Sequence, residues 1–295
     1  MATHGYAQAQ TEMPLYPDRS IPNSLSKVQE EQIRDMGDGN QFVSNTTVPT
    51  ITAYLPRSGG VFIPAVIIFP GGGYAGVSIT AEGKDVAEAF NKIGVAAFVV
   101  KYRMPNDLTM VDKSKGPLQD AQQAIRLVRK KADEWGLNAH KIGVVGFSAG
   151  GHLAATLCTH YQKNLIKTTD PGSLLRPDFA VLVYPVISMT DSLTHAGSRR
   201  NLLGAHPTAE EVTLYSNELQ VDEYTPPALL IHAGDDSAVN WENSIRYYQA
   251  LRKKGVAAEL IIYQEGGHGY GLKNRTTSDL WIERCRDWMK ANKWL

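Results

Sequence analysis

The sequence holds little cysteine, no excess charge of either sign and no long apolar run, and each of these absences excludes a class of protein. Cys158 and Cys285 are the only cysteines among 295 residues, so we expect two structural thiols rather than a disulfide framework. Lysine plus arginine and aspartate plus glutamate both number 30, which argues against nucleic acid as a partner. The most apolar runs, residues 61–69 and 95–100, are far shorter than the ~20 residues of a membrane-spanning helix. We therefore predict no membrane span.

Common metal and nucleotide motifs are missing as well. The chain contains no H-E-x-x-H, no C-x-x-C and no phosphate-binding glycine loop, so neither a metal nor a nucleotide cofactor is predicted. Near the start, residues 7–9 (AQA) resemble a small-residue cleavage site, but residues 1–6 hold no apolar segment. A trimmed secreted or periplasmic protein and a cytoplasmic protein both stay open, as does the oligomeric state.

Length and patterning predict an α/β protein. The 295 residues, 43% of them hydrophobic, suit one large domain. Short apolar runs alternate with amphipathic segments, which indicates a mostly parallel central sheet with helices on both faces. The expected strands are residues 47–55 (antiparallel), 65–69, 95–101, 142–145, 179–184, 228–232 and 258–263, and the expected helices are residues 81–93, 117–135, 241–254 and 278–290.

The stretch KIGVVGFSAGGH, residues 141–152, joins a β-branched run to a helical segment through the letters GFSAG around Ser148. A G-x-S-x-G pattern between a strand and a helix is typical of a nucleophile elbow. The turn strains the backbone of the central serine, and Gly146 and Gly150 avoid a collision of side chains there. The sequence therefore predicts Ser148 as a nucleophile at a helix N-terminus, whose dipole favours a developing negative charge.

A serine hydroxyl needs a base that removes its proton, and in open α/β folds this base lies on another loop at the carboxyl edge of the sheet. His268 lies in the glycine-rich loop GGHGYG, residues 266–271, directly after the last expected strand. We predict His268 as the base. His152 is closer in sequence, but it lies four residues along the same helix as Ser148 and is interpreted as structural.

The base must in turn be oriented by a carboxylate. The segment HAGDDSAV, residues 232–239, leaves a strand and offers Asp235 and Asp236. We choose Asp236 and interpret Asp235 as a turn or helix-capping acid. The resulting chain order of Ser148, Asp236 and His268 is the order found in α/β-hydrolases.

An acyl-transfer site also needs donors for the negative charge that develops on the carbonyl oxygen. The loop PGGGY, residues 70–74, follows a buried strand, and its glycine amides can approach a substrate without a Cβ in the way. On its own this loop would be interpreted as a tight turn. Together with the elbow, it predicts an oxyanion hole formed by the amides of Gly72, Gly73 and Ala149.

Residues 1–40 are polar and contain three prolines, so we expect an irregular N-terminal arm. Residues 41–295 would form the catalytic domain. A polar insertion at about residues 187–225 separates two expected strands and is predicted to cover the site.

Other polar residues are weaker candidates. Arg199 and Arg200 lie in the basic segment HAGSRRNLLG of the insertion, where they either contact substrate or form internal salt bridges. Tyr74 is a candidate for the lining of an acyl pocket. On the long expected helix, three charged residues are predicted to form ion pairs rather than to take part in catalysis: Asp120, Arg126 and Arg129.

Five segments together carry a family resemblance. PGGGY, DAQQAIRLVRKKADEWG, GFSAGGHLA, HAGDD and GGHGYG resemble the α/β-hydrolase esterases related to hormone-sensitive lipase, and especially bacterial acetyl-xylan esterase-like proteins. The resemblance covers the chain from about residue 50 to the end and implies a catalytic triad of Ser148, Asp236 and His268. Pro70 stands where that group often has the histidine of His-Gly-Gly-Gly.

The resemblance implies a serine esterase that hydrolyses short-acyl esters of carbohydrates, acetyl esters above all, through an acyl-enzyme. The substrate would be a small-molecule or oligosaccharide ester, because the insertion carries charged and histidine side chains that suit a water-soluble alcohol. A general carboxylesterase and a feruloyl esterase are alternatives. A prolyl-oligopeptidase-type peptidase would need a larger N-terminal domain than the roughly 50 residues before the sheet, and a non-catalytic binding protein on this fold would not need the triad.

Overall fold

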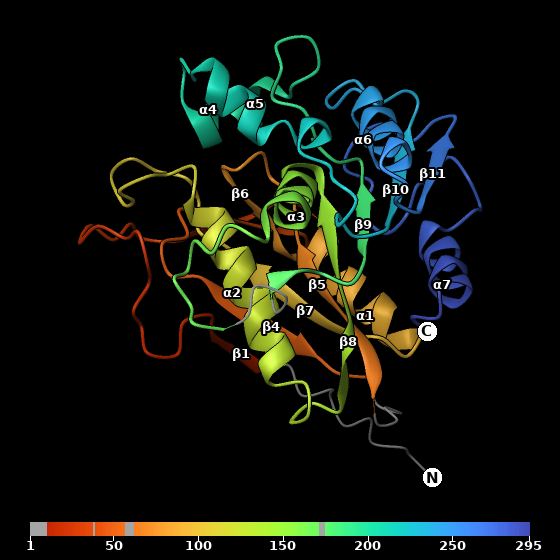
Figure 1. Ribbon diagram of the computed structural model, residues 1–295, viewed down its shortest axis with the longest axis horizontal. Helices are drawn as coiled ribbons and strands as arrows, with labels where there is room; N and C mark the ends of the chain where they lie inside the picture. Colours follow the sequence, from red (N-terminus) through yellow and green to blue (C-terminus); the bar gives the residue numbers. More distant parts are fainter. Residues whose placement is uncertain (1–10, 38, 57–61, 171–174) are drawn as a thin grey trace.

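The computed structural model describes residues 11–37, 39–56, 62–170 and 175–295 (Figure 1). Within them, an eight-stranded sheet has the order β1-β4-β7-β5-β8-β9-β10-β11, and a three-stranded sheet has the order β2-β3-β6. The strands of the large sheet are β1 (Thr11–Pro14), β4 (Thr50–Tyr54), β5 (Ile63–Phe69), β7 (Ala96–Lys101), β8 (Leu137–Phe147), β9 (Ala180–Val183), β10 (Ala228–Ala233) and β11 (Ala258–Tyr263), and those of the small sheet are β2 (Gln32–Asp35), β3 (Gln41–Ser44) and β6 (Gly76–Ser78).

The large sheet is mostly parallel, as predicted. Strands β7, β5, β8, β9, β10 and β11 run in one direction, and only β4 and β1 add antiparallel pairs at one edge. Alternate residues of β5 belong to different cores, with Ile67 and Phe69 on one face and Val66 and Ile68 on the other. Because both faces are buried, the strand is a continuous apolar run rather than an alternating one.

Helices cover both faces of this sheet and supply the partners of its buried side chains. On one face, α2 (Gly116–Lys130), α3 (Ser148–His160) and α6 (Glu242–Lys253) contribute buried residues to a common core. On the other face, α1 (Asp85–Lys92) and α7 (Trp281–Ala291) do the same. Each fully buried large aliphatic or aromatic side chain in these cores contributes roughly 1.5–3 kcal/mol to folding.

The two cysteines lie in different cores. Cys158 of α3 and Cys285 of α7 are free and buried on opposite faces of the large sheet. Burial raises the pKa of the Cys158 thiol to about 12, so it stays protonated and packs as a small apolar group. Of the helices in the described ranges, none combines the length and the apolar character needed to cross a membrane.

The N-terminal segment is more regular than the irregular arm predicted for residues 1–40. Strand β1 pairs with β4 at the edge of the large sheet, and β2 pairs with β3 in the small sheet. Leu15 and Tyr16 are buried against the core that contains α2. Pairing with distant strands orders this polar segment, and composition alone does not reveal such pairing. The domain boundary near residue 40 stays a prediction, and the cleavage-like residues 7–9 lie outside the described residues.

A buried ion pair joins the segment directly after β7 to α2. Arg103 Nη2 lies 2.8 Å from Asp120 Oδ1, and both side chains are almost fully buried. The hydroxyl of Tyr16 donates a further hydrogen bond of 3.0 Å to Asp120 Oδ1. The ion pairs expected on the long helix are confirmed: Arg103–Asp120, Arg126–Asp170 and Arg129–Asp178.

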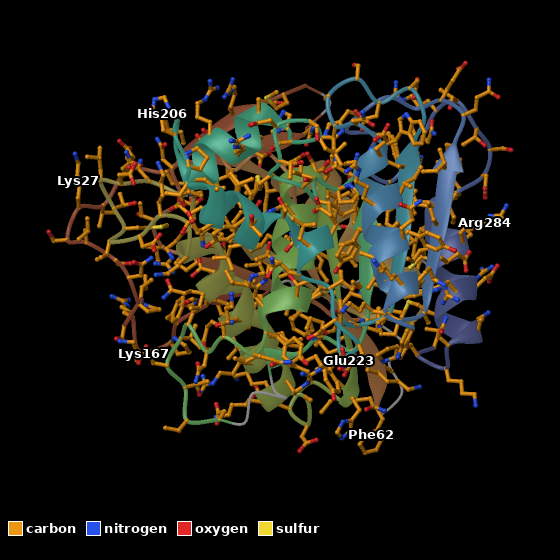
Figure 2. All side chains as sticks on the ribbon, turned by 45° about the horizontal axis from the view of Figure 1, so that its top comes forward. Lys27, Phe62, Lys167, His206, Glu223 and Arg284 are labelled. Carbon is orange, nitrogen blue, oxygen red and sulfur yellow. The ribbon has the colours of Figure 1, made fainter. Side chains whose placement is uncertain are left out.

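The insertion between β9 and β10, residues 184–227, is helical. We call it the cover, and its position over the site stays a prediction. It contains three short helices: α4 (Ala196–Leu203), α5 (Ala209–Tyr215) and the 3₁₀ helix η3 (Asn217–Leu219). In Figure 1, α4 and α5 lie at the top of the view, above α3. Asn243 of α6 anchors the first residues of the cover, because its Oδ1 accepts hydrogen bonds from the amides of Ile187 and Ser188 at 2.9 and 3.0 Å. His206, from the same insertion, points outward at the rim of the molecule (Figure 2).

Candidate active site

The predicted elbow is present, since β8 ends at Phe147 and α3 begins at Ser148. Ser148 has φ +50°, a left-handed conformation that side-chain-bearing residues rarely adopt. Close packing explains the glycine two residues further on, because a Cβ on Gly150 would lie 2.1 Å from the carbonyl oxygen of Phe69. The turn therefore holds Ser148 at the carboxyl end of the sheet and at the N-terminus of α3.

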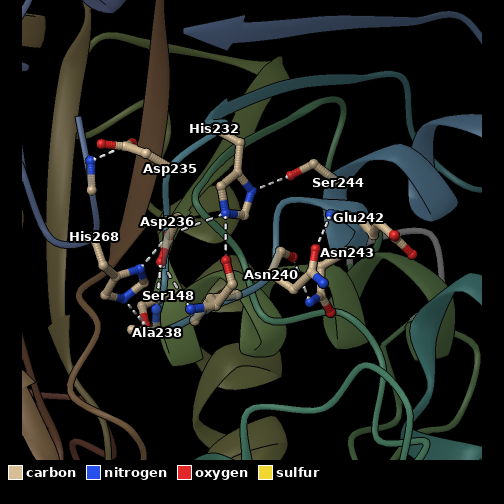
Figure 3. A network of polar contacts seen from close by, with 12 residues as sticks. Ser148, His232, Asp235, Asp236, Ala238, Asn240, Glu242, Asn243, Ser244 and His268 are labelled. Carbon is tan, nitrogen blue, oxygen red and sulfur yellow. Dashed lines mark hydrogen bonds and ion pairs between the residues drawn. The ribbon is translucent and has the colours of Figure 1, made fainter. Parts of the chain in front are cut away.

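His268 lies in the loop after β11, and its ring bridges the serine and an aspartate (Figure 3). Its Nε2 is 2.9 Å from Ser148 Oγ, and its Nδ1 is 2.7 Å from Asp236 Oδ2. Because a carboxylate only accepts, Nδ1 carries the proton and Nε2 accepts from the serine hydroxyl. The three side chains form one hydrogen-bonded chain with the connectivity that removal of the serine proton requires.

Asp236 follows β10, and both of its oxygens have partners. Oδ1 accepts hydrogen bonds from the amides of Ala238 and Val239 at 3.0 and 2.9 Å. Oδ2 also lies 3.2 Å from Nε2 of a second imidazole, His232. Burial by itself raises the pKa of Asp236, but hydrogen bonds from His232 and His268 outweigh it, and the pKa lies below the usual aspartate value. The carboxylate facing His268 is therefore ionised.

The neighbouring Asp235 turns away from the imidazole of His268 (Figure 3). Its Oδ1 accepts a hydrogen bond of 2.8 Å from the amide of Gly267, so it ties down the loop that carries the histidine. This hydrogen bond lowers the pKa of Asp235. Of the two adjacent acids, the structure brings Asp236 to His268, and Asp235 is a loop-fixing acid.

His152 and Tyr74 lie in the core. His152 Nδ1 is 2.8 Å from the hydroxyl of Tyr74, and its Nε2 donates to the carbonyl of Tyr215 at 2.8 Å. Burial lowers the pKa of His152 to about 4, so the ring is neutral and structural, as predicted. The Tyr74 side chain is 2% exposed and its hydroxyl is engaged. The structure thus packs Tyr74 into the core instead of bringing it together with the Ser148–His268 pair.

The PGGGY loop presents backbone donors beside the elbow. Gly72 has φ +147° and Gly73 has φ +64°, and a Cβ on Gly72 would lie 2.2 Å from the carbonyl oxygen of Gly76. In the described part of the chain, the amides of Gly72 and Gly73 have no protein acceptor. The amide of Ala149 lies in the first turn of α3, where no intrahelical acceptor exists. These donors have the properties expected of the predicted oxyanion hole.

Helix α4 of the cover contacts the same loop. Asn201 Nδ2 donates a hydrogen bond of 2.8 Å to the carbonyl of Gly73. His195 caps α4, because its Nδ1 accepts from the amide of Ser198 at 3.2 Å, and a Cβ on Gly73 would lie 3.9 Å from its Cε1. Burial lowers the pKa of His195, so the ring is neutral and its proton is on Nε2. A neutral donor therefore lies next to the glycine loop.

Arg199 and Arg200 do not join this group. Arg199 forms an ion pair with Asp191, and Arg200 is exposed. Ser198, which contacts His195, and Asn201 are three residues apart and therefore share one face of α4. The two arginines lie on other faces of this helix. The basic segment thus brings a histidine and an asparagine, rather than its arginines, to the glycine loop.

Several polar residues near the site were not predicted from the sequence. His232 had a usable signal, since a histidine at the carboxyl end of the apolar strand ALLIHA is out of place unless it has polar partners. Glu82 and Asn201 had none, because they lie in ordinary polar helical stretches. Across the described ranges, His, Cys, Asp and Glu side chains form no group of three that could hold a metal ion.

The sheet, the elbow and the order of the Ser148, Asp236 and His268 loops define an α/β-hydrolase fold. The chain belongs to the BD-FAE family, whose sequence profile matches residues 51–251. An acetylxylan esterase of Xylanibacter ruminicola is 40% identical over 233 residues, which are 77% of this chain and 45% of the relative. An endo-1,4-beta-xylanase B of Butyrivibrio fibrisolvens is 36% identical over 263 residues, 88% of this chain and 40% of the relative. The chain thus spans less than half the length of these two relatives.

A solved structure gives a match over almost the entire length of both chains. The acetyl ester-xyloside bifunctional hydrolase from Caldicellulosiruptor lactoaceticus is 35% identical, with a TM-score of 0.81 and coverage of 99% of each chain. The predicted resemblance to acetyl-xylan esterase-like α/β-hydrolases is confirmed.

Proposed function

We propose that the protein is a serine carboxylic-ester hydrolase in which Ser148, His268 and Asp236 form the catalytic triad. The observation that supports this proposal is the hydrogen-bonded chain of 2.9 Å from serine to imidazole and 2.7 Å from imidazole to carboxylate. As Ser148 Oγ attacks the acyl carbon, His268 Nε2 takes its proton, and the ionised Asp236 stabilises the imidazolium. The imidazolium then protonates the departing alcohol.

The second half of the reaction reverses these roles with water. His268 takes a proton from a water molecule that attacks the acyl-enzyme, and the acid leaves as Ser148 regains its proton. In both halves, the amides of Gly72, Gly73 and Ala149 donate to the oxygen that becomes negative. Preorganised donors of this kind contribute roughly 3–4 kcal/mol each to transition-state stabilisation.

The proposed substrate is an acetyl ester of a soluble carbohydrate. The names of an acetylxylan esterase and an acetyl ester-xyloside hydrolase among the similar proteins support this substrate class. The cover supports it as well, because His195 and Asn201 place polar groups next to the glycine loop. Such groups suit a hydroxyl-rich alcohol better than a lipid chain, which would need a broad apolar surface.

The test is a series of 4-nitrophenyl esters from acetate to dodecanoate, together with acetate release from acetylated xylan. We expect the highest kcat/KM for acetate and measurable acetate release, both absent in Ser148→Ala prepared in the same way. Faster turnover of dodecanoate, or no acetate from acetylated xylan, would contradict the carbohydrate assignment. Wild-type rates in a folded Ser148→Ala protein would contradict the triad.

A further inference from the structure

A carboxylate without a cationic partner is buried beneath the proposed active site. Glu82 lies in the π-helical turn η1 (Ile79–Lys84), between β6 and α1, and is only 6% exposed. Among the described residues, no lysine or arginine forms an ion pair with it. Burial of a lone carboxylate is costly unless hydrogen bonds compensate it. A π-helical turn inside a helix is also a feature that occurs frequently at functional sites.

Two hydrogen bonds to Glu82 join loops that are far apart in the sequence. Its Oε2 accepts from the amide of Gly71 at 2.6 Å, directly before the two glycines proposed for the oxyanion hole. Its Oε1 accepts from the hydroxyl of Tyr184 at 2.8 Å. The oxygen of that hydroxyl accepts from the amide of Gly271 at 2.9 Å, in the loop that carries His268. One side chain therefore connects the oxyanion loop to the histidine loop.

This connection passes directly behind the reacting groups. A Cβ on Gly71 would lie 2.8 Å from both Glu82 Oε2 and Ser148 Cβ, so a larger residue at this position would collide with the carboxylate and with the serine. The ring of Tyr184 packs edge-on against the imidazole of His268, with their centroids 4.9 Å apart. Movement of Glu82 would therefore disturb both Ser148 and His268.

The protonation state of Glu82 follows from its surroundings. Burial raises its pKa, while hydrogen bonds from Tyr184 and Gly71 and the nearby imidazole of His268 act in the opposite sense. Burial outweighs these effects, and the pKa of Glu82 lies above the usual glutamate value. The amide of Gly71 can only donate, and the hydroxyl of Tyr184, which already accepts from Gly271, donates its proton to Glu82, so the hydrogen-bond pattern is that of an ionised carboxylate. Besides Glu82, the ionisable groups around the imidazole in the described part of the chain include Asp236 and Asp235 after β10, His195 on the cover and the phenols of Tyr184 and Tyr270. His232 of β10 contacts the same oxygen of Asp236 as His268 does.

We propose that Glu82 is a positioning residue that fixes the oxyanion loop and the histidine loop relative to each other and adds negative charge that favours the imidazolium. The proposal rests on the serine-esterase function proposed above. It makes Glu82 a second acid behind the triad, acting through Gly71 and through Tyr184 and not by contact with substrate. Misplacement of reacting groups by about 1 Å costs roughly 10²-fold in rate, which sets the size of the expected effect.

The experiment compares Glu82→Gln with Tyr184→Phe and with the control Glu88→Gln, a change of the same type at a partly exposed position on α1 whose ion pair with Lys84 spans 4.0 Å. We measure kcat/KM for 4-nitrophenyl acetate from pH 5 to 9 and thermal unfolding of each protein. Glu82→Gln should lower kcat/KM by about 10²-fold and move the acid limb of the profile to lower pH. The limb moves in that direction because an imidazolium that has lost a nearby negative charge releases its proton more readily.

Tyr184→Phe should lower kcat/KM by about tenfold, because it removes the link to Gly271, and should move the acid limb less than Glu82→Gln does, because the Glu82 carboxyl group remains. The double variant should be no slower than Glu82→Gln alone, because both changes break the same link. Glu88→Gln should match the wild type in rate and profile.

A folded Glu82→Gln protein with wild-type kcat/KM and an unmoved acid limb would overturn the proposal. If Glu82→Gln does not fold, Tyr184→Phe decides, and a wild-type rate in that variant rejects the link between the loops. Failure of the esterase function itself has a different signature, namely a wild-type protein that hydrolyses no ester or an active Ser148→Ala protein. The two failures are therefore distinguishable.

Discussion

Two buried acids in this protein have opposite surroundings. Asp120 accepts hydrogen bonds from the guanidinium and the amide of Arg103 and lies against a compensating positive charge. Glu82 accepts from the amide of Gly71 and the hydroxyl of Tyr184 and lies against no cation among the described residues. The first network joins the segment after β7, helix α2 and the N-terminal segment, and the second lies beneath the proposed active site.

The difference indicates what each network is for. In a buried ion pair whose hydrogen bonds are all formed, removal of one partner leaves the other charge uncompensated and destabilises the fold. The charge of Glu82 is compensated by two hydrogen bonds alone until the imidazole of His268 gains a proton during the proposed reaction. We therefore expect changes around Asp120 to affect the free energy of unfolding, and changes around Ser148 and Glu82 to affect the rate.

The largest effect should come from Ser148→Ala, which removes the proposed nucleophile. We expect kcat to fall by roughly 10⁵-fold. The elbow glycines and the packing of α3 remain, so the melting temperature should stay within a few degrees of the wild type. Ester hydrolysis tests the expected fall in kcat, and thermal unfolding of the same preparation tests the expected melting temperature. A large loss of stability would show that the hydroxyl is part of the scaffold.

Asp236→Asn should follow, with a loss in kcat of about 10⁴-fold, because the amide cannot fix the tautomer of His268 in which Nδ1 carries the proton. Asp235→Asn is the matched control on the adjacent residue. It weakens one hydrogen bond to Gly267 and should cost no more than about tenfold through a looser loop. Steady-state kinetics of both variants tests the assignment, and equal losses would refute it.

Arg103→Met tests the buried ion pair with Asp120. It leaves Asp120 buried without its cation, and the free energy of unfolding should fall by about 3–5 kcal/mol. For folded molecules, kcat/KM should stay within about threefold of the wild type, because distant sites act independently. Arg246→Met, which breaks a half-exposed pair with Glu242, is the control and should cost less than about 1 kcal/mol. Urea unfolding measures both, and a similar loss in the two variants would contradict the assignment.

The smallest effect concerns acid stability. The pKa of Asp236 is lower in the folded protein than in the unfolded chain, so the folded state binds fewer protons there. The resulting stability is fully present above the unfolded value of ~3.9 and is lost as the pH falls through the folded value. Asp236→Asn should therefore weaken the fall in stability below about pH 4. Urea midpoints at intervals from pH 2 to 5 test this, and identical acid profiles would contradict it.

Local sequence was sufficient for the parts of the site that lie at strand ends. The elbow around Ser148 is a contiguous motif with a steric cause, so its geometry follows from its local amino-acid sequence. Asp236 and His268 could be assigned because each follows an apolar strand, and parallel strands bring their carboxyl ends to one edge of the sheet. The structure reproduces these expected contacts.

The remaining features depend on contacts between distant segments. Strand β1 is a short polar segment that gains its order from pairing with β4. Glu82 and Asn201 acquire their significance only when folding brings them to Gly71 and Gly73. Their own neighbourhoods in the sequence look like ordinary helix surface. Arg199 was a reasonable candidate by charge, but a nearby acid on the same insertion already pairs with it.

The order of the large sheet also bears on how folded copies behave at high concentration. Its two outer strands, β1 and β11, each have one edge without a partner strand in the described part of the chain. The first carries an exposed Glu12 and ends in Pro14, which has no amide hydrogen, and the second carries an exposed Glu259. Charges and missing donors hinder the addition of a further strand. Both margins of the sheet therefore oppose the strand-by-strand growth that leads to fibrils.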